Sequence, residues 1–454
     1  MKLFYRILYR FYRRSAALRH WAGRRFTPAG LTVLAGLVLT GALGVDTENS
    51  VAYQAFTVLF ALLLLAVCFS WFFRARFSVT RILPQFGTAG VAFHYTVVVR
   101  NLAARAQRGL TLLEDVPNPR PSFEEWVAVW RHARRQMRSW RLRPPQPGDP
   151  FKVALTLESP VPPALPGQEV QVPMEATPRR RGVLHLTGVI LARPDPLGLF
   201  RAFVRVPLGQ SVLILPKRYP VPPIALPGTL KYQEGGVALA ANVGQSEEFV
   251  SLRDYRHGDP LRHIHWRSWA KAGQPVVKEF ADEFFVRHAL VLDTFTDEPR
   301  SEVFEEAVSV AASFACSVQT QESLLDLLFV GPHSYCLTAG RGLAQTDQLL
   351  EVLASVGPCH DQPFQSLEHL VLNHIEAVSG CICVLLGWDA DRQGFVRKLR
   401  TLGVPVRVLV VTEPGQTGAL EPGAMEDEPG RFTVLEAGNV EPGLAALDGG
   451  GPGL

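Results

Sequence analysis

Two long apolar runs near the N-terminus constrain the fold more strongly than any other feature of this sequence. They cover residues 28–45 and 52–73, and a short stretch containing Asp46 and Glu48 separates them. A helix needs roughly 20 apolar residues to cross the hydrocarbon core of a bilayer, so the second run fits well and the first lies near the lower limit. A cleaved signal peptide is disfavoured for the first run, because a long basic leader precedes it and a second apolar run follows at once. The sequence therefore predicts that residues 1–76 form a basic leader and a two-helix transmembrane hairpin.

The distribution of charge predicts the orientation of this hairpin. Residues 1–81 contain eleven Lys and Arg side chains but only two acidic ones, so their net charge is +9. The whole chain has a net charge of +4, so the remaining residues have a net charge of −5. Arg-rich segments flank the hairpin, which by the positive-inside rule places both termini in the cytoplasm of a multi-pass, inner-membrane protein. Residues 1–26 alternate aromatic and Arg side chains, as expected for a helix on anionic membrane lipid, although a solvated leader is an alternative. The acidic remainder disfavours a nucleic-acid partner.

Residues 77–217 have the pattern of short strands. Segments rich in Val, Leu and Thr alternate with Pro and Gly, which predicts a β-sandwich-like domain. A helical insertion at residues 122–143 interrupts this pattern, and Ser122 and Glu125 have capping-box spacing at its start. Apolar residues then recur on one helical face, namely Trp126, Trp130, Ala133, Met137 and Trp140. We expect this face either to pack on the sandwich or to bind a membrane surface or a partner.

The second half of the chain divides into a connector and an α/β domain. Residues 218–286 contain a Pro- and Gly-rich connector and a charged block, residues 248–285, that is dense in Arg, Asp, His and Trp. In residues 287–447 strand-like and helix-like segments alternate, which predicts a Rossmann-like domain with a mostly parallel sheet covered by helices. Ligands of such sheets bind at the carboxyl ends of the strands, so residues 293–297 and 387–391 are expected at the functional edge. Residues 448–454 are predicted to be a disordered tail.

The charged block also resembles a known family. Its spaced residues are similar to the signature of the DUF58 family, namely Glu248, Phe249, Leu252, Arg253, Tyr255, Arg256, Gly258, Asp259, Arg262, Ile264, Trp266, Ala270 and Lys271. An upstream run that contains Asp195, Pro196, Gly198, Leu199 and Phe200 resembles the same family. The resemblance therefore extends over most of the chain. The resemblance implies a membrane-anchored protein with a von Willebrand factor A-like domain. It also implies a MoxR-type AAA+ ATPase, and other von Willebrand A proteins, as partners.

The same resemblance indicates where a cation would bind. A von Willebrand A domain usually holds a divalent cation through an Asp-x-Ser-x-Ser motif after its first strand, which supplies hard oxygen ligands. Here Asp293 keeps the leading carboxylate, but Phe295 replaces the first serine and Asp297 the second. The candidate ligands of a degenerate magnesium site are Asp293, Thr296, Asp297 and Asp389. Because Phe295 cannot ligate, we expect a protein without a cofactor, in which Asp293 caps a loop or a helix.

The charges of the block favour a structural or partner-binding role over catalysis. Between residues 247 and 283, six Lys and Arg side chains stand against seven Asp and Glu side chains, which predicts an ion-pair network. Its candidate members are Glu248, Arg253, Tyr255, Arg256, Asp259, Arg262, Trp266 and Lys271. Trp266 and Trp269 are expected to pack against the sheet. The resulting hypothesis is not an enzyme but a membrane-anchored, cytoplasm-facing scaffold or adaptor in the assembly or maturation of other proteins.

A metal-dependent hydrolase is the alternative function. It would use His257, Asp259, His263 and His265 as metal ligands or as a general base. The sequence contains no P-loop, no Gly-rich dinucleotide fingerprint and no Ser or Cys nucleophile motif. Any ATP-driven work therefore has to come from a partner.

Overall fold

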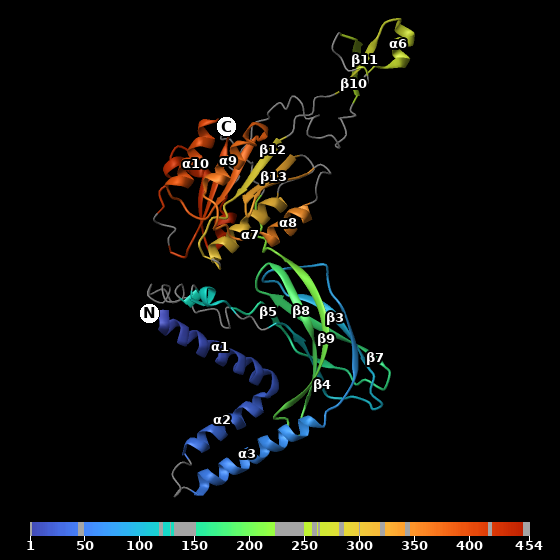
Figure 1. Cartoon of the computed structure of the whole chain (residues 1–454). Coiled ribbons are helices and arrows are strands. Elements are labelled where there is room, and N and C mark those ends of the chain that lie inside the picture. Colours follow the sequence, from blue (N-terminus) through green and yellow to red (C-terminus); the bar gives the residue numbers. More distant parts are fainter. Residues whose placement is uncertain are drawn as a thin grey trace. The chain divides into compact units, whose positions relative to one another are not determined.

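The computed structural model of the chain describes residues 2–43, 50–117, 121–127, 129–130, 151–222, 249–256, 261, 264–280, 286–298, 300–317, 323–340, 346–415 and 420–447. The chain forms two compact units, Met1–Lys217 and Arg218–Leu454. The first unit contains helices and two β-sheets, and the second contains two further sheets with their helices (Figure 1). The boundary lies at the residue where the predicted β domain ends.

Three helices begin the first unit. They are α1 (Lys2–Arg25), α2 (Pro28–Leu43) and α3 (Ser50–Trp71). Among the described residues, one helix is long and apolar enough to cross a membrane, judged by length and composition, and it covers Val51–Trp71 within α3. α2 has 16 residues, so at about 1.5 Å per residue it spans roughly 24 Å and falls short of a hydrocarbon core of about 30 Å. The predicted two-helix transmembrane hairpin is therefore supported for its second helix only.

α2 and α3 are antiparallel neighbours that pack through small residues. A Cβ atom added at Gly36 would lie 3.3 Å from Leu59 Cδ1, and one added at Gly41 would lie 3.3 Å from the ring of Phe56. Glycine at these two positions lets the helices approach closely, as small residues do in helix pairs within membranes. The short α2 is thus held along the longer α3.

Two β-sheets form the rest of the first unit, with strand orders β1–β3–β7–β5 and β2–β9–β8–β4–β6. The strands are β1 (Phe77–Ile82), β2 (Phe86–Thr88), β3 (Phe93–Asn101), β4 (Leu110–Asp115), β5 (Ala154–Thr156), β6 (Ser159–Val161), β7 (Glu169–Pro178), β8 (Gly182–Pro194) and β9 (Arg201–Leu215). One hydrophobic cluster joins Val97 and Val172 of the first sheet with Leu112 and Leu191 of the second. The sheets therefore share a core, which is the β-sandwich-like arrangement that the sequence predicts.

The hairpin of β8 and β9 is longer than its sequence suggests. The sequence predicts a strand only at residues 212–217, whereas β9 covers Arg201–Leu215. Pro207 and Gly209 lie inside β9 and hide its periodicity. The pairing shifts register next to Gly188, where an added Cβ atom would lie 2.5 Å from the carbonyl oxygen of Val206. Glycine is required there because the two backbones approach so closely.

The helical insertion begins as predicted. Residues 123–127 and 129–130 are helical. The backbone N–H of Ser122 donates to Glu125 Oε2 over 2.9 Å, and the backbone N–H of Glu125 donates to Ser122 Oγ over 3.1 Å. This reciprocal pair is the capping box expected from the sequence, and it satisfies two N–H groups at the helix start.

The apolar face of this insertion packs on α1. Trp126 is buried in a cluster with Tyr9 and Tyr12 of α1 and with Phe151. Trp130 lies against the same helix, with its ring centroid 5.6 Å from that of Tyr5. The expectation that this face packs on the sheets of the sandwich is therefore replaced by packing on the N-terminal helix. The remaining residues of the predicted face, Ala133, Met137 and Trp140, lie outside the described residues.

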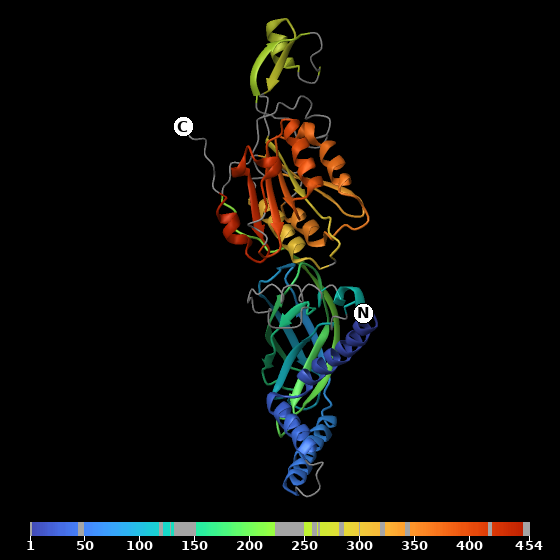
Figure 2. The ribbon, with the colours of Figure 1, turned by 90° about the vertical axis from the view of Figure 1, so that its left-hand side faces the viewer.

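The second unit contains a six-stranded sheet with strand order β14–β13–β12–β15–β16–β17, in which every neighbouring pair is parallel except β13–β14. Its strands are β12 (Val286–Leu292), β13 (Ser323–Val330), β14 (Ser334–Ala339), β15 (Gly380–Leu385), β16 (Val406–Thr412) and β17 (Phe432–Glu436). Its helices are α7 (Glu302–Ser317), α8 (Thr346–Ser355), α9 (Gln365–Leu372), α10 (Ala390–Thr401) and α11 (Val440–Ala445). Helices cover both faces of the sheet (Figure 2). The mostly parallel, helix-covered sheet predicted from the sequence is confirmed.

Successive residues of the central strands point into two different cores. Ala289 and Val291 of β12 lie in the cluster that contains Phe395 and Leu399 of α10. Every residue of β15 is buried, so the strand is covered on both sides. This pattern is typical of a central parallel strand, which explains why β15 reads as a continuous apolar run in the sequence.

Candidate functional site

The six-stranded sheet has a topological switch point between β12 and β15. In the chain β12 leads to β13 on one side and β15 leads to β16 on the other, so the loops after these two strands diverge. Both segments predicted at the functional edge, residues 293–297 and 387–391, follow these strands. The backbone N–H of Asp293 donates to the carbonyl oxygen of Val384 over 2.9 Å. Ligands of open α/β sheets bind at such a point, so its side chains are the first candidates for function.

Asp293 is fully buried at this edge. Its Oδ1 accepts a hydrogen bond of 3.0 Å from the backbone N–H of Phe295, and its Oδ2 accepts one of 3.0 Å from the backbone N–H of Leu386. Oδ2 also accepts from Arg392 Nε over 2.6 Å. A carboxylate in a dry interior is stable only when it is paired and hydrogen-bonded, and Asp293 meets both conditions.

Arg392, in the first turn of α10, is the counter-charge of two carboxylates. Its Nη1 forms an ion pair with Asp389 Oδ2, while Asp389 Oδ1 caps α10 by accepting the backbone N–H of Arg392 over 3.0 Å. Its Nη2 donates to the carbonyl oxygen of Phe295 over 3.3 Å, and its Cζ lies 5.1 Å from the centroid of the Phe364 ring. Burial opposes the charge of Arg392, but Asp293 and Asp389 more than offset it, so the pKa of this guanidinium lies above its ordinary value.

The residues predicted as cation ligands therefore do not fit a magnesium ion. Asp293 and Asp389 meet as expected, but the guanidinium of Arg392 supplies the positive charge between them. Thr296 Oγ1 accepts the backbone N–H of Glu298 over 3.2 Å, and Asp297 is exposed. In the part of the chain that the structure describes, no group of three or more His, Cys, Asp and Glu side chains is placed to hold a metal ion.

The charged block forms a small sheet and a helix. β10 (Phe249–Asp254) pairs antiparallel with β11 (Val276–Phe280), and α6 (Trp266–Ala272) lies between them in the chain. The backbone N–H of His265 donates to the carbonyl oxygen of Val276 over 2.8 Å, and Ile264 forms a bridge with Val277. Gly273 ends α6 with a φ of 72°, a left-handed conformation that favours glycine. We call the described residues between 249 and 280 the signature module.

Several predicted members of the block lie outside the described residues, namely Glu248, Asp259 and Arg262, together with His257 and His263 of the alternative hydrolase. Of the others, Arg253 and Tyr255 are half-buried, and Arg256, Trp266 and Lys271 are exposed. The rings of Trp266 and Trp269 stack with centroids 5.1 Å apart and an interplanar angle of 17°. Trp266 is nonetheless 65% exposed. The expectation that this tryptophan packs against a sheet is therefore wrong, and it presents an aromatic face to solvent instead.

Polar contacts between described residues of the signature module include short-range ones and one between the two ends of the strand pair. Gln274 Nε2 donates to Asp254 Oδ1 over 3.0 Å, and Arg253 Nη1 donates to the carbonyl oxygen of Asp254 over 3.2 Å. His265 Nδ1 lies 2.6 Å from Ser268 Oγ. The predicted ion-pair network includes residues outside the described part of the chain, so it stays a prediction.

The turn between β8 and β9 is a second candidate, because it contains the upstream residues of the family resemblance. Asp195 is buried, and its carboxylate accepts the backbone N–H of Leu197 over 2.9 Å. It also accepts the N–H groups of Leu199 and Phe200, each over 2.7 Å. Gly198 has a φ of 69°. The turn thus requires an acceptor at residue 195 and glycine at residue 198.

This turn is attached to the start of α2. Oγ1 of Thr27 donates to the carbonyl oxygen of Gly198 over 2.5 Å, and the backbone N–H of Thr27 donates to the carbonyl oxygen of Leu199 over 3.1 Å. The ring of Phe26 meets that of Phe200 edge-on, with centroids 5.1 Å apart. A Cβ atom added at Gly30 would lie 1.9 Å from the same carbonyl oxygen, so only glycine permits this contact. The function of the turn is therefore to fix the apolar helices to the sandwich.

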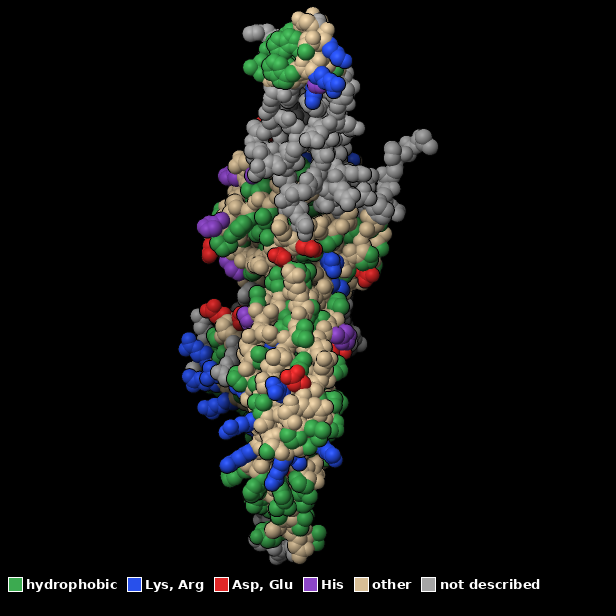
Figure 3. Space-filling model, turned by 90° about the vertical axis from the view of Figure 1, so that its right-hand side faces the viewer, with side chains coloured by type: hydrophobic (Ala, Val, Ile, Leu, Met, Phe, Trp, Pro, Cys, Tyr) green, Lys and Arg blue, Asp and Glu red, His purple; other side chains and the backbone are tan. Residues whose placement is uncertain are grey.

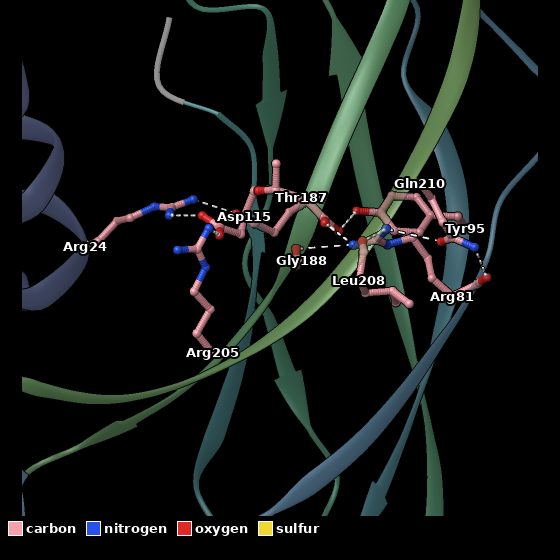
Figure 4. Close-up of polar contacts among 10 residues, drawn as sticks. Arg24, Arg81, Tyr95, Asp115, Thr187, Gly188, Arg205, Leu208 and Gln210 are labelled. Carbon is pink, nitrogen blue, oxygen red and sulfur yellow. Dashed lines mark hydrogen bonds and ion pairs between the residues drawn. The ribbon is translucent and has the colours of Figure 1, made fainter.

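A charged cluster attaches the C-terminal end of α1 to the sandwich (Figure 4). Arg24 Nη1 lies 3.1 Å from Asp115 Oδ1, and Arg24 Nη2 donates to the carbonyl oxygen of Glu114 over 2.5 Å. Arg205 of β9 forms an ion pair with the other carboxylate oxygen of Asp115. β4 thus holds the end of the N-terminal helix, and Arg205 of β9 shares the carboxylate of Asp115 with Arg24.

Glu114 itself belongs to a buried ion pair in the sandwich. Its Oε1 lies 2.5 Å from Arg81 Nη2, and its Oε2 accepts from the hydroxyl of Tyr95 over 2.6 Å. Arg81 also donates to the carbonyl oxygens of Gly188 and Leu208, each over 3.2 Å (Figure 4). Burial raises the pKa of the Glu114 carboxyl, and the Tyr95 hydroxyl and Arg81 only partly oppose that rise. Neither charged side chain is exposed to solvent, so this pair belongs to the core of the sandwich.

Most of the charged block and much of the α/β unit are similar to a known protein family. Residues 251–416 match the family model described as "Protein of unknown function DUF58". The match covers less than half of the chain. The Asp195 turn and the apolar helices lie outside it, so the expected resemblance over most of the chain is supported only for this DUF58 region.

A curated relative and a solved structure were also compared. The Bacillus subtilis protein described as "Uncharacterized protein YeaD" is 27% identical over 178 residues, which are 38% of this chain and 42% of that protein. The alignment therefore spans less than half of the relative's length. A crystal structure of a GH20 exo-β-N-acetylglucosaminidase from Vibrio harveyi in complex with N-acetylglucosamine aligns over 75% of this chain and 57% of its own, at 9% identity. Its TM-score of 0.13 carries no argument about fold or function.

The sequence did not single out the basic partners of these sites. The Asp389–Arg392 pair could have been found from the sequence, because the two residues are three apart at the start of a helix and so lie on one helical face. This helix lies within the DUF58 region. For Arg24 and Arg81 no such signal exists, since their partners Asp115 and Glu114 are 91 and 33 residues away. Only folding brings these charges together.

Proposed function

We propose that the protein is a membrane-anchored adaptor, without enzymatic activity of its own, whose signature module binds a protein partner in the cytoplasm. The observation that carries the proposal is the exposed aromatic face of Trp266, which shares the module with exposed Leu252 and Leu261. Figure 3 shows hydrophobic side chains on one side of this module, at the top of the view, and basic ones on the other. A large apolar side chain rimmed by charge is typical of the centre of a protein interface.

The anchoring part of the proposal is built on the first unit. α3 crosses the inner membrane, α2, which is shorter than the hydrocarbon core, crosses beside it with local thinning of the bilayer, and both termini lie in the cytoplasm. Support comes from the length of α3 and from the Arg-rich segments on either side of the apolar helices. The Asp195 turn connects the apolar helices to the sandwich, because this turn is hydrogen-bonded to the start of α2.

The partner part of the proposal follows from the DUF58 resemblance. The α/β unit is proposed to be von Willebrand factor A-like, since Asp293 follows the strand that begins the sheet in the chain, with Arg392 in place of the cation. The partner is proposed to be a MoxR-type AAA+ ATPase, which would supply the ATP-driven work that the sequence does not encode. The complex would act in the assembly or maturation of other proteins.

The proposal is tested by retention of the ATPase on the full-length, detergent-solubilised protein. Trp266→Ala removes the exposed ring, and loss of a central interface tryptophan typically costs about 2 kcal/mol, or roughly thirtyfold in affinity. Leu402→Ala is the matched control, because Leu402 is a similarly exposed apolar side chain of the same unit. We expect wild type and Leu402→Ala to retain the ATPase and Trp266→Ala to lose most of it, with unchanged melting temperatures. Equal retention by both variants would contradict the proposed surface.

A further inference from the structure

We infer that the outward face of α1 binds the anionic headgroups of the membrane that α3 enters, and so holds the sandwich against the bilayer surface. The inference rests on the proposed membrane anchoring and adds a second, peripheral contact with lipid. It concerns the first unit alone, in which α1, α2, α3 and the sandwich are in direct contact.

The inward face of α1 packs on other parts of the first unit. The hydroxyl of Tyr9 donates to the carbonyl oxygen of Pro121 over 2.7 Å, and the ring of Tyr12 lies 5.9 Å from that of Trp126. At the other end, Arg24 is paired with Asp115. Because α1 is held at its middle and at its C-terminal end, it cannot rotate about its axis, and its opposite face is fixed in an outward direction.

That opposite face carries an apolar stripe exposed to solvent. Ile7, Phe11, Leu18 and Trp21 follow one another at steps of four, seven and three residues, which places them on one side of the helix. They are between 51% and 70% exposed. Single apolar residues on a surface need no explanation, but four in line on one helix mark a surface that another apolar phase covers.

Arginines border the stripe, Arg14 lies within it between Phe11 and Leu18, and this charge identifies what covers the stripe. Arg6, Arg10, Arg13, Arg14 and Arg19 are exposed, and α1 contains no acidic residue. Figure 3 shows Lys and Arg side chains gathered along one edge of the first unit, above the hydrophobic helices. A helix with aromatic and aliphatic side chains flanked by arginines lies in the interface of an anionic bilayer, where the stripe enters the acyl boundary and the guanidinium groups meet phosphates.

The position of the stripe in the chain also favours a bilayer as the phase that covers it. α1 ends at Arg25 and α2 begins at Pro28, so Trp21 lies one helical turn before the connection to the apolar helices. Figure 1 shows that α1 leaves α2 at a bend and does not extend its line. The C-terminal end of the stripe therefore lies next to the apolar helices, at the level of the proposed membrane surface. A free nucleic acid or an acidic protein would match the arginines but would leave the four apolar side chains without an apolar environment.

The experiment places the full-length chain in lipid nanodiscs and measures the depth of the stripe. Phe11→Trp introduces a reporter at the middle of the stripe, and its signal is the emission of this variant minus that of the parent protein. The discs contain phosphatidylcholine alone or with about one third phosphatidylglycerol, and in each case the acyl chains are dibrominated near the headgroup to quench tryptophan. We expect the reporter signal to be quenched by about half in the anionic discs and several times less in the neutral ones.

Two triple variants of the reporter protein serve as test and control. Arg10→Glu/Arg13→Glu/Arg14→Glu is expected to lose the quenching in anionic discs, whereas Arg10→Lys/Arg13→Lys/Arg14→Lys is expected to keep it. Co-elution of the chain with the discs reports anchoring separately. A chain that co-elutes but shows no quenching overturns this inference and leaves the proposed anchoring intact. A chain that does not enter the discs overturns both.

Discussion

Removing the carboxylate of Asp293 should destabilise the α/β unit strongly, because this buried group pairs with Arg392. Asp293→Ala deletes the acceptor of Arg392 Nε, at 2.6 Å, and of the backbone N–H groups of Phe295 and Leu386. Among the described residues the guanidinium then keeps Asp389, whose side chain is 55% exposed, the carbonyl oxygen of Phe295 and the ring of Phe364. The variant thus leaves a largely buried cation with half of its compensating charge.

The size of the effect follows from the burial of this pair. Breaking a buried ion pair by removing one member costs about 3–5 kcal/mol. The side chain of Arg392 is 12% exposed and that of Asp293 is 0% exposed, so water reaches the guanidinium slightly and the lower end, about 3 kcal/mol, applies. In a unit of this size each kcal/mol lowers Tm by roughly 2–4 °C, which gives a decrease of about 6–12 °C.

Scanning calorimetry of the full-length protein in detergent measures this decrease. Asp297→Ala is the matched control, because Asp297 is an exposed carboxylate in the same loop, and its Tm should stay within about 2 °C of wild type. The double variant Asp293→Ala/Arg392→Ala should lose less stability than the sum of the two single variants, since the pair is coupled. Additive losses, or an Asp293→Ala variant that melts like wild type, would refute the pairing. A rise in wild-type Tm on adding Mg²⁺ that Asp293→Ala abolishes would show that the carboxylate binds a cation instead.

Two other buried groups give further predictions. Asp195→Ala should lower the stability of the first unit by about 2–4 kcal/mol, because the N–H groups of Leu199 and Phe200 lose their acceptor, while Asp195→Asn, which keeps one oxygen, should lose less in the same calorimetric scan. His288 is buried with no hydrogen-bond partner for Nδ1 among the described residues, and burial lowers its pKa from 6.5 to about 4. The unfolded chain therefore binds this proton first, so stability should fall by about 1.4 kcal/mol per pH unit as pH drops from 6.5 towards 4. Denaturant titrations should show a shallower decline for His288→Leu, and identical pH profiles would contradict the assignment.

The elements of this protein were largely determined by the sequence alone. The alternation of apolar runs and amphipathic segments after residue 287 predicts the order and type of the strands and helices of the α/β unit, because hydrophobic periodicity reflects which faces are buried. The capping box of Ser122 and Glu125 is also a local property, and the structure contains it. The edge of the sheet that brings Asp293 and Asp389 together follows from strand order, which a parallel α/β fold largely dictates.

The partners of these side chains were decided only by the tertiary structure. Asp293 and Arg392 are 99 residues apart, and Thr27 meets Leu199 across 172 residues. Such pairs leave no periodic trace, since their distance depends on how whole elements pack and not on the neighbours of each residue. The same holds for α1, whose alternating aromatic and basic residues indicate a helix at an interface but not which face is free. Packing of Tyr9 and Tyr12 on Trp126 takes one face, and that contact leaves the arginine-bordered stripe exposed.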